Sequence, residues 1–294
     1  MAVTGIALVD KPGGITSHDV VARARRAFGT RKIGHAGTLD PMATGLLVLG
    51  VEGATRLLTF IVGLDKTYEA TIRLGVATDS DDADGEMTTT MDASALADEQ
   101  IRTAIKPLTG RISQVPSTVS AIKVNGKRAY DLARAGEQVE LAAREVTVSR
   151  FDVLAIERSE SVIDLDVVVD CSSGTYIRAL ARDLGAALGV GGHLTALRRT
   201  RIGPFGVDGA SSVDGLAEAA VLSPAVVAAD VLGRFDVTAD EARDLRHGKR
   251  LVGAAARLEA GRAAIDPDGA LVGIVERRGS DVKSAMNMPE ERPA

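Results

Sequence analysis

Two segments of the chain alternate apolar and polar residues, and this pattern constrains the fold more than any other feature. The apolar positions are Tyr68, Ala70, Ile72 and Leu74 in the first segment, and Ile163, Leu165, Val167, Val169 and Cys171 in the second. Because successive side chains of a strand point to opposite faces, the pattern predicts two half-buried β-strands. Cys171 lies on the apolar side, so we expect it to pack in a core rather than perform chemistry.

Helical signals accompany these strands. Residues 3–9 suggest a short strand, and residues 16–19 supply N-cap candidates for a helix that runs through Phe28 and ends at Gly29. Residues 172–175 precede another helix, whose apolar face recurs at helical spacing up to Leu188. The chain therefore mixes α and β structure.

Tyr176 and Arg178 fall in the first turn of that second helix. The helix dipole does not favour a cation there. Local misfits of this kind are commoner at functional sites than elsewhere, so Arg178 is a candidate for a functional role.

The character of the chain changes near residue 230. Thr238 and Glu241 have capping-box spacing for a helix through Arg246, and residues 264–275 read as two strands joined by a Pro-Asp-Gly turn. From Ser280 onward the tail is polar, and we expect it to be loosely held. A chain of 294 residues suits one large domain, 1–230, and one small domain, 231–294.

Several classes of protein are disfavoured. The N-terminus lacks the pattern of a secretory signal, and no apolar run reaches the roughly 20 residues of a spanning helix. One cysteine permits no internal disulfide, which suits a reducing cytoplasm. His18, His35, His193 and His247 show no metal-ligand spacing, so neither a metal nor another cofactor is expected.

Two further segments do not match the binding motifs that they resemble. Residues 80–85 are similar to a calcium loop, but the twelfth position of that loop would be Met91 instead of an acid. A turn, or packing near an active site, is the better interpretation. Residues 10–14 are too short and wrongly ordered for a phosphate-binding P-loop.

The net charge of −5 hides a segregation of charges. Residues 20–39, 100–130 and 184–207 carry cations and no carboxylate, whereas residues 79–86 and 207–242 are acidic. A charge run is usually a solvated face. Three carboxylate-free stretches nevertheless allow an RNA-binding surface on an acidic protein.

Asp40 stands alone among these cations. It lies between Gly37 and Gly45, directly before Pro41, which favours an extended or turn conformation at the aspartate. A positive surrounding holds a carboxylate ionised. From the residues alone, Asp40 is either an ordinary turn residue or a nucleophile that faces a polyanion.

Five blocks in order resemble the bacterial tRNA pseudouridine-55 synthase family. The blocks are residues 10–19, 32–45, 66–68, 174–178 and 193–199, and they span residue 6 to about residue 205. The resemblance implies an α+β fold with a mixed, largely antiparallel sheet flanked by helices in the catalytic domain. It also implies a small β-rich, PUA-like RNA-binding domain at the C-terminus.

The resemblance also implies a site. Asp40 would be the carboxylate nucleophile or its equivalent, and Arg178 would pair with it. Tyr68 would stack on the flipped uracil, and Tyr176 and Leu197 would line the pocket that holds this base. His35 would fill the space that the base vacates. The candidates for RNA-backbone contacts are Lys123, Lys127, Arg128, Arg198 and Arg199.

The implied activity is isomerisation of uridine 55 in the tRNA T-loop by base flipping, without a cofactor. The implied partner is the T-arm stem-loop of tRNA, with no membrane, no protein partner and a monomeric enzyme. Ser117 and Val119 depart from the family pattern, which puts RNA contacts through that segment in doubt. Two other hypotheses stay open: an RNA-binding module or tRNA chaperone, and a carboxylate-nucleophile hydrolase.

Overall fold

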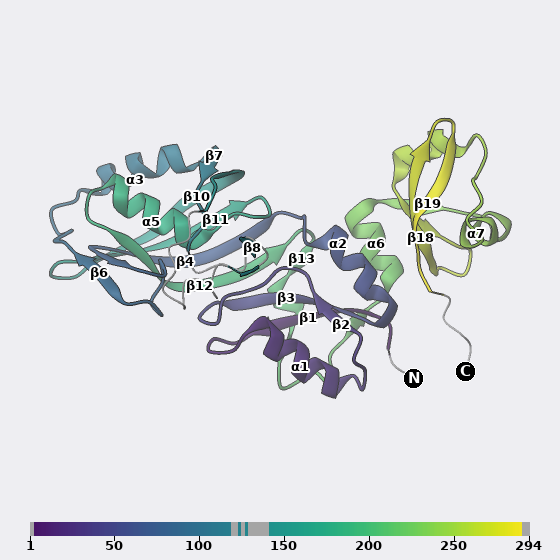
Figure 1. Ribbon diagram of the computed structural model, residues 1–294, viewed down its shortest axis with the longest axis horizontal. Coiled ribbons are helices and arrows are strands. Elements are labelled where there is room, and N and C mark those ends of the chain that lie inside the picture. The colour runs from purple at the N-terminus through teal and green to yellow at the C-terminus, as the bar shows by residue number, and fades with distance from the viewer. Residues whose placement is uncertain (1–2, 119–122, 125–126, 129–140, 290–294) are drawn as a thin grey trace. The chain divides into compact units, whose positions relative to one another are not determined.

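The structure is a computed structural model that describes residues 3–118, 123–124, 127–128 and 141–289. By its internal contacts the chain divides into two compact units. Unit 1 comprises residues 1–40, 45–62 and 203–294, and unit 2 comprises residues 41–44 and 63–202. The chain is α+β, as expected from the sequence (Figure 1).

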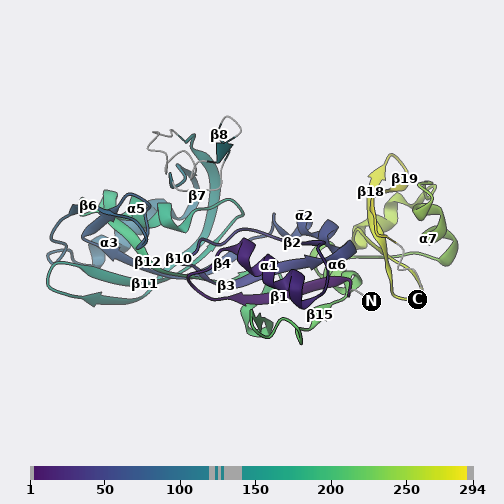
Figure 2. The same cartoon turned by 60° about the horizontal axis from the view of Figure 1, so that its bottom comes forward.

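Unit 2 is built on an antiparallel sheet with the strand order β12-β4-β11-β10-β7. The strands of unit 2 are β4 (Lys66–Leu74), β5 (Val76–Thr78), β6 (Met87–Thr90), β7 (Gly110–Gln114), β8 (Lys123–Val124), β9 (Lys127–Arg128), β10 (Arg144–Arg158), β11 (Ile163–Cys171) and β12 (Gly192–Ile202). Of these, β5 pairs with β6 and β8 pairs with β9 in two separate two-stranded sheets. Its helices are α3 (Asp98–Ile105), the 3₁₀ turn η2 (Lys106–Leu108) and α5 (Ile177–Ala187). Figure 2 shows α3 and α5 on the same face of these strands.

The two alternating segments are the neighbouring strands β4 and β11, which confirms the predicted strands. Their apolar side chains are buried on one face, and α5 packs against β12 and β4. Cys171 is buried in this core, where burial raises the pKa of its thiol to about 11. The expectation that it packs rather than reacts agrees with this environment.

In unit 1 several strands are paired around β1. The elements of unit 1 up to residue 222 are β1 (Gly5–Lys11), α1 (Ser17–Ala27), β2 (Ile33–His35), β3 (Thr44–Val51), η1 (Glu52–Leu57), α2 (Leu58–Ile61), β13 (Phe205–Gly206), η3 (Val207–Gly209), β14 (Ser211–Ser212) and β15 (Val221–Leu222). β1 pairs antiparallel with β3 and β15 and parallel with β14. Helix α1 ends with Phe28 as its C-cap, and Gly29 follows with φ +64°, as the sequence predicts.

The C-terminal part of unit 1 carries a second sheet with the order β16-β17-β18-β19. Its elements are α6 (Pro224–Leu232), β16 (Arg234–Asp236), α7 (Ala239–Arg246), η4 (Ala254–Ala260), β17 (Ala263–Ile265), β18 (Leu271–Arg278) and β19 (Asp281–Asn287). The capping box of Thr238 and Glu241 and the turn between β17 and β18 are confirmed.

The expectation of a loose tail from Ser280 onward is wrong for residues Asp281–Asn287. Residues Asp281–Asn287 form β19, which pairs with β18. Val282 is fully buried in the small core, and the backbone ladder binds the polar residues around it. A polar sequence can therefore still be a strand, because main-chain hydrogen bonds do not depend on side-chain polarity.

Candidate active site

Asp40 lies on the loop between β2 and β3 in unit 1, and it is half-buried. The loop begins where His35 pairs with Leu49, and the backbone N–H of Ala36 donates to Val48 at 2.9 Å. Gly37 has φ +91°, a conformation that a side chain would strain. The structure has no helix at Asp40, which agrees with the expected extended or turn conformation before Pro41.

Ser17, the first residue of α1, holds this loop next to the aspartate. Its buried hydroxyl accepts a hydrogen bond from the Leu39 N–H at 2.9 Å and donates one to the Leu39 carbonyl at 3.2 Å. The segment that leads into α1 is itself supported by Lys11, whose Nζ donates to the carbonyls of Pro12 at 2.9 Å and Ile15 at 2.8 Å. Sequence reasoning missed both supports.

His35 contacts a second histidine. The rings of His18 and His35 are 5.6 Å apart between centroids and meet edge to face at 84°. His18 is exposed near the start of α1, and His35 is half-buried at the end of β2. The aromatic contact therefore ties the predicted histidine to the same helix that supports the Asp40 loop.

Arg178 lies in unit 2, where it forms a buried ion pair. Its Nη1 lies 3.3 Å from Oδ2 of Asp82 and donates to the Ser80 carbonyl at 2.7 Å. The Arg178 and Asp82 side chains are only 4% and 7% exposed. The sequence analysis did not identify Asp82 as a partner of Arg178; it interpreted residues 80–85 as a turn or as packing near an active site.

The neighbouring Asp81 binds the next turn of the same helix. Arg182 Nη1 lies 3.2 Å from Asp81 Oδ2, and Arg182 Nη2 donates to the Val115 carbonyl at 2.7 Å. Burial raises the pKa of the Asp81 carboxyl, and the guanidiniums of Arg182 and Arg178 counteract this in part. The acidic turn thus binds two successive turns of α5 on one face of the helix.

Tyr176 is the N-cap residue of α5 and is half-buried. The side chain of Gln114, at the end of β7, binds both polar groups of the Tyr176 backbone. It donates to the carbonyl at 3.0 Å and accepts from the N–H at 2.9 Å. This buried amide sets where α5 begins, one residue later than the sequence suggests.

Tyr68 and Leu197 lie on the same face of adjacent strands. Leu197 on β12 is opposite Ala70, and Arg199 is opposite Tyr68 on β4. Tyr68 and Leu197 are therefore diagonal neighbours, a spacing within reach of an aromatic ring. Both side chains are buried, so the structure brings these two predicted residues together.

The same register corrects one expectation, namely that Arg198 and Arg199 both contact the RNA backbone. Arg199 is 1% exposed and shares the face of Tyr68, whereas Arg198 is opposite Glu69 on the other face. Consecutive strand residues point to opposite sides, so the pair cannot form one basic surface. We no longer expect Arg199 to contact a phosphate.

Arg199 instead lies near Lys66, which is also buried. Burial, and to a smaller extent the charge of Arg199, together lower the pKa of the Lys66 ammonium from 10.5 to about 8. Lys66 is opposite Cys171 on β11 and Ile202 on β12. A buried cation pair thus lies on the Tyr68 side of the sheet.

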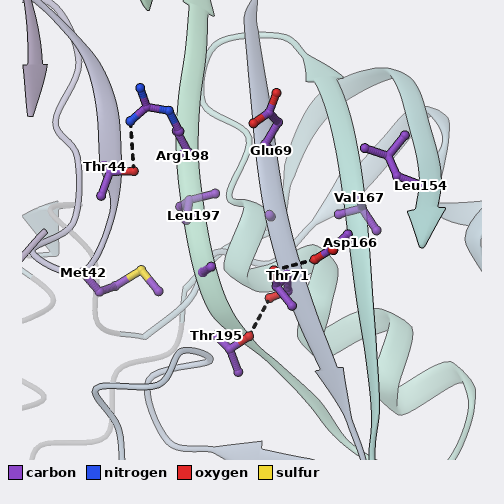
Figure 3. Close-up of a pocket in the computed structure, with 12 residues that line it drawn as sticks. Met42, Thr44, Glu69, Thr71, Leu154, Asp166, Val167, Thr195, Leu197 and Arg198 are labelled. Atoms are coloured by element: carbon purple, nitrogen blue, oxygen red, sulfur yellow. Dashed lines mark hydrogen bonds between the residues drawn. The ribbon is translucent and has the colours of Figure 1, made fainter. Parts of the chain in front are cut away.

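Arg198 lies at an open depression of about 490 Å³ in unit 2 (Figure 3). Its Nη1 lies 3.5 Å from the hydroxyl of Thr44, and Glu69 is on the neighbouring strand. Across the depression the Thr71 hydroxyl donates to Asp166 Oδ1 at 2.8 Å. The lining mixes both charges, so it is not a uniformly basic surface.

The other basic candidates lie in two short paired strands. Lys123 in β8 is opposite Arg128 in β9, and Lys127 is opposite Val124. The structure does not describe their side chains. Of the two departures from the family pattern, Ser117 is buried and Val119 lies outside the described residues.

In the part of the chain that the structure describes, no group of three histidine, cysteine or carboxylate side chains has the arrangement of a metal site. Among the same residues no helix is both long and apolar enough to cross a membrane.

Comparison with known proteins defines the class of this molecule as pseudouridylate synthase. Residues 25–177 match the TruB family pseudouridylate synthase N-terminal domain. Residues 178–235 match the tRNA pseudouridylate synthase B C-terminal domain, and residues 232–289 match the C-terminal domain of tRNA pseudouridine synthase II.

Individual relatives agree with this assignment. The chain is 56% identical to the tRNA pseudouridine synthase B of Mycobacterium sp. (strain KMS), over 99% of this chain and 97% of the relative. It is also 56% identical to that of Leifsonia xyli subsp. xyli, over 100% and 99% of the two chains. The chain belongs to the TruB family of pseudouridine synthases and is an isomerase.

A solved structure shares the fold at lower identity. The H/ACA RNP bound to a substrate RNA containing 2′-deoxyuridine has a chain with a TM-score of 0.71 and 23% identity. The match covers 98% of this chain and 86% of that one, and it extends the fold assignment to nearly the whole protein.

Proposed function

We propose that this enzyme converts uridine 55 in the T-loop of tRNA to pseudouridine. The observation that carries the proposal is Asp40, a half-buried carboxylate in the family motif, presented on a loop held by strand pairing and by Ser17. The relatives at 56% identity, which are tRNA pseudouridine synthases B, support the choice of tRNA as the substrate.

The reaction breaks the N1–C1′ bond of uridine and joins C5 to C1′. The C5 proton leaves and N1 gains a proton, so the isomerisation balances without an oxidant, a reductant or nucleotide energy. The target base must first leave its stack, at a cost of a few kcal/mol. Asp40 would act as the nucleophile or its equivalent, by attack at C1′, addition at C6 or elimination to a glycal.

The other roles follow from the family and from the local supports. Arg178 would pair with Asp40 and keep it ionised and aimed, while the ion pair with Asp82 anchors the guanidinium. Tyr68 would stack on the uracil and help to remove the C5 proton. Tyr176 and Leu197 would line the base pocket, and His35 would occupy the space that the flipped base leaves.

Backbone contacts are proposed for Lys123, Lys127 and Arg128, and for Arg198 outside the base pocket. Residues 231–294 would act as a PUA-like RNA-binding domain that reaches helical RNA beyond the target loop. The catalytic roles would then belong to residues 1–230. The enzyme would work as a monomer in the cytoplasm.

The test is incubation of the purified protein with an unmodified tRNA transcript, followed by mapping of pseudouridine. Product at position 55 alone is the expected result. Binding without product would instead indicate an RNA-binding module or chaperone. Metal-dependent turnover of a phosphate ester, with no pseudouridine, would indicate a hydrolase.

A further inference from the structure

We propose that Ser17 is a positioning residue for Asp40, and that its hydroxyl fixes the direction in which the carboxylate is presented. The proposal rests on the proposed role of Asp40 as the reacting carboxylate. Ser17 would touch neither the substrate nor the reacting atoms. It would act on Asp40 through the backbone of Leu39.

The hydroxyl of Ser17 is placed by a rigid element. Helix α1 packs on strands β1 and β3 through Val20, Val21 and Ala24, which share a buried cluster with residues of these strands. Its first turn is closed by a capping box, in which the Asp19 N–H donates to Thr16 Oγ1 at 3.1 Å and the Thr16 N–H donates to Asp19 Oδ2 at 2.8 Å. The packing of Val20, Val21 and Ala24 fixes the position of the Ser17 Cβ relative to β1 and β3, and the capping box adds only to the stability of the helix.

The Asp40 loop needs such a support at its centre. Strand pairing holds one end of the loop at His35 and the other end from Gly45, which is opposite Lys11 on β1. Between these anchors the described residues 36–43 belong to no helix or strand. Ser17 reaches the middle of this span from a position 22 residues earlier in the chain.

The bond to the Leu39 carbonyl has a direct geometric consequence. The carbonyl of Leu39 and the N–H of Asp40 belong to one planar peptide group. When Ser17 Oγ binds that carbonyl at 3.2 Å and the preceding Leu39 N–H at 2.9 Å, the peptide plane on the N-terminal side of Asp40 is fixed. The N and Cα atoms of Asp40 are then placed before RNA binds, which restricts the directions that its Cα–Cβ bond can take.

A serine suits this place because one hydroxyl both donates and accepts. Ser17 is 1% exposed, so water does not readily replace the hydroxyl if it is removed. In Ser17→Ala the N–H and carbonyl of Leu39 would lose their partner in a buried setting and would turn toward other partners. The peptide before Asp40 would rotate, and small displacements of a reacting group lower the rate of the chemical step strongly.

The experiment compares Ser17→Ala with Thr16→Ala in the full chain, using a tRNA transcript. Thr16→Ala removes the cap of the same helix and leaves the Ser17 hydroxyl in place. We expect Ser17→Ala to lower kcat by roughly 10- to 100-fold with KM nearly unchanged. Thr16→Ala should lower the melting temperature similarly while kcat stays close to that of the wild type.

Equal kcat values for wild type and Ser17→Ala, or an equal loss of kcat in both variants, would overturn the proposal. Amide hydrogen exchange on the wild-type protein supplies a measurement that needs no variant. The Leu39 amide should be strongly protected although it lies in a loop, and exchange at the rate of an open loop would also overturn it.

The two proposals fail in different ways. No pseudouridine at position 55 from the wild-type protein would remove the proposed function, and turnover by Asp40→Asn would remove the role of Asp40 on which the positioning role rests. An inactive Asp40→Asn together with a fully active Ser17→Ala would remove the positioning role alone.

Discussion

Arg178 and Asp82 form an ion pair in which both side chains are almost entirely withdrawn from solvent, with 3.3 Å between Nη1 and Oδ2. The same guanidinium is held by the carbonyl of Ser80, and Asp82 accepts from the Ser80 hydroxyl at 2.5 Å. Arg178 is thus fixed at the start of α5 independently of any bound RNA. This arrangement has consequences for both stability and turnover.

Asp82→Asn should lower the free energy of unfolding by about 3 kcal/mol, because it leaves a buried guanidinium without its carboxylate. Turnover should also fall, since Arg178 would lose its anchor. Urea unfolding and single-turnover kinetics measure the two effects. Glu145→Gln is the matched control: it breaks the exposed pair with Arg111, which should cost less than about 1 kcal/mol. An equal cost for both substitutions would contradict the prediction.

Asp40→Asn should abolish pseudouridine formation while changing the affinity for tRNA by less than about tenfold, or roughly 1.4 kcal/mol. The carboxylate is required for bond making, whereas the affinity comes mainly from phosphate contacts. Mapping of pseudouridine and a filter-binding titration of the same preparation provide the two readouts. Measurable turnover by a homogeneous preparation would rule out the assigned role.

Lys66 should make stability depend on pH above neutrality. The pKa of its ammonium is lowered from 10.5 to about 8, chiefly by burial. Below pH 8 the folded and unfolded states both carry the proton, and the unfavourable burial of the charge is fully present. Between about pH 8 and 10.5 the unfolded state binds more protons, so this contribution stabilises the fold as pH rises.

The free energy of unfolding of Lys66→Met measures this effect. Relative to that variant, the wild type should gain up to about 3 kcal/mol as the pH rises through this range. Lys106→Met, at an exposed lysine, is the control and should show no comparable gain. A difference between wild type and Lys66→Met that does not vary with pH would contradict the prediction.

Binding of tRNA should weaken steeply with salt, each phosphate contact adding roughly 0.7 to 0.9 to the negative log–log slope. Removal of Lys127 and Arg128 together should lower that slope without altering the chemical step at saturating RNA. Arg158→Gln, at a cation already paired with Asp98, should leave the slope unchanged. An affinity of the wild type that is insensitive to salt would exclude a phosphate-contacting interface.

A chain that ends after Gly233 should keep the chemistry and bind intact tRNA more weakly. The end lies there because a cut at residue 230 would fall inside α6, whose Val227 and Ala228 are buried. The comparison uses both proteins on intact tRNA and on an isolated T-arm hairpin. The loss should be smaller on the hairpin, which offers less helical RNA. A folded truncation that is inactive on both would show that residues beyond 233 help to build the site.

Local patterns predicted the parts of the fold that depend on neighbours in sequence. The alternation in β4 and β11, the caps at Thr16 and Thr238, and the Asp40 turn all follow from rules that span a few residues. Because side chains alternate between the two faces of a strand, the sequence alone would also have placed Arg198 and Arg199 on opposite faces. The strand β19 was missed because its pairing depends on main-chain groups and on a single buried apolar residue.

The supports of the candidate site were less accessible to sequence reasoning. The Gln114 amide and the Tyr176 backbone are 62 residues apart in the chain, and Ser80 and Arg178 are 98 apart. No periodicity links such pairs, because they depend on how the strands and α5 pack in three dimensions. The acidic residues of segment 80–85 were noticeable in the sequence, but carboxylates at such spacing indicate a metal-ion site more readily than a partner for Arg178.

The burial of Cys171 has a practical meaning for work on this enzyme. It is the chain's one cysteine, it is buried, and its pKa is raised to about 11. Thiol reagents should therefore not modify it at neutral pH. A cysteine introduced at Val252, which is 86% exposed, would then be the only thiol to react. A fluorophore could therefore be attached to the C-terminal part of the native chain without first replacing a residue of the core.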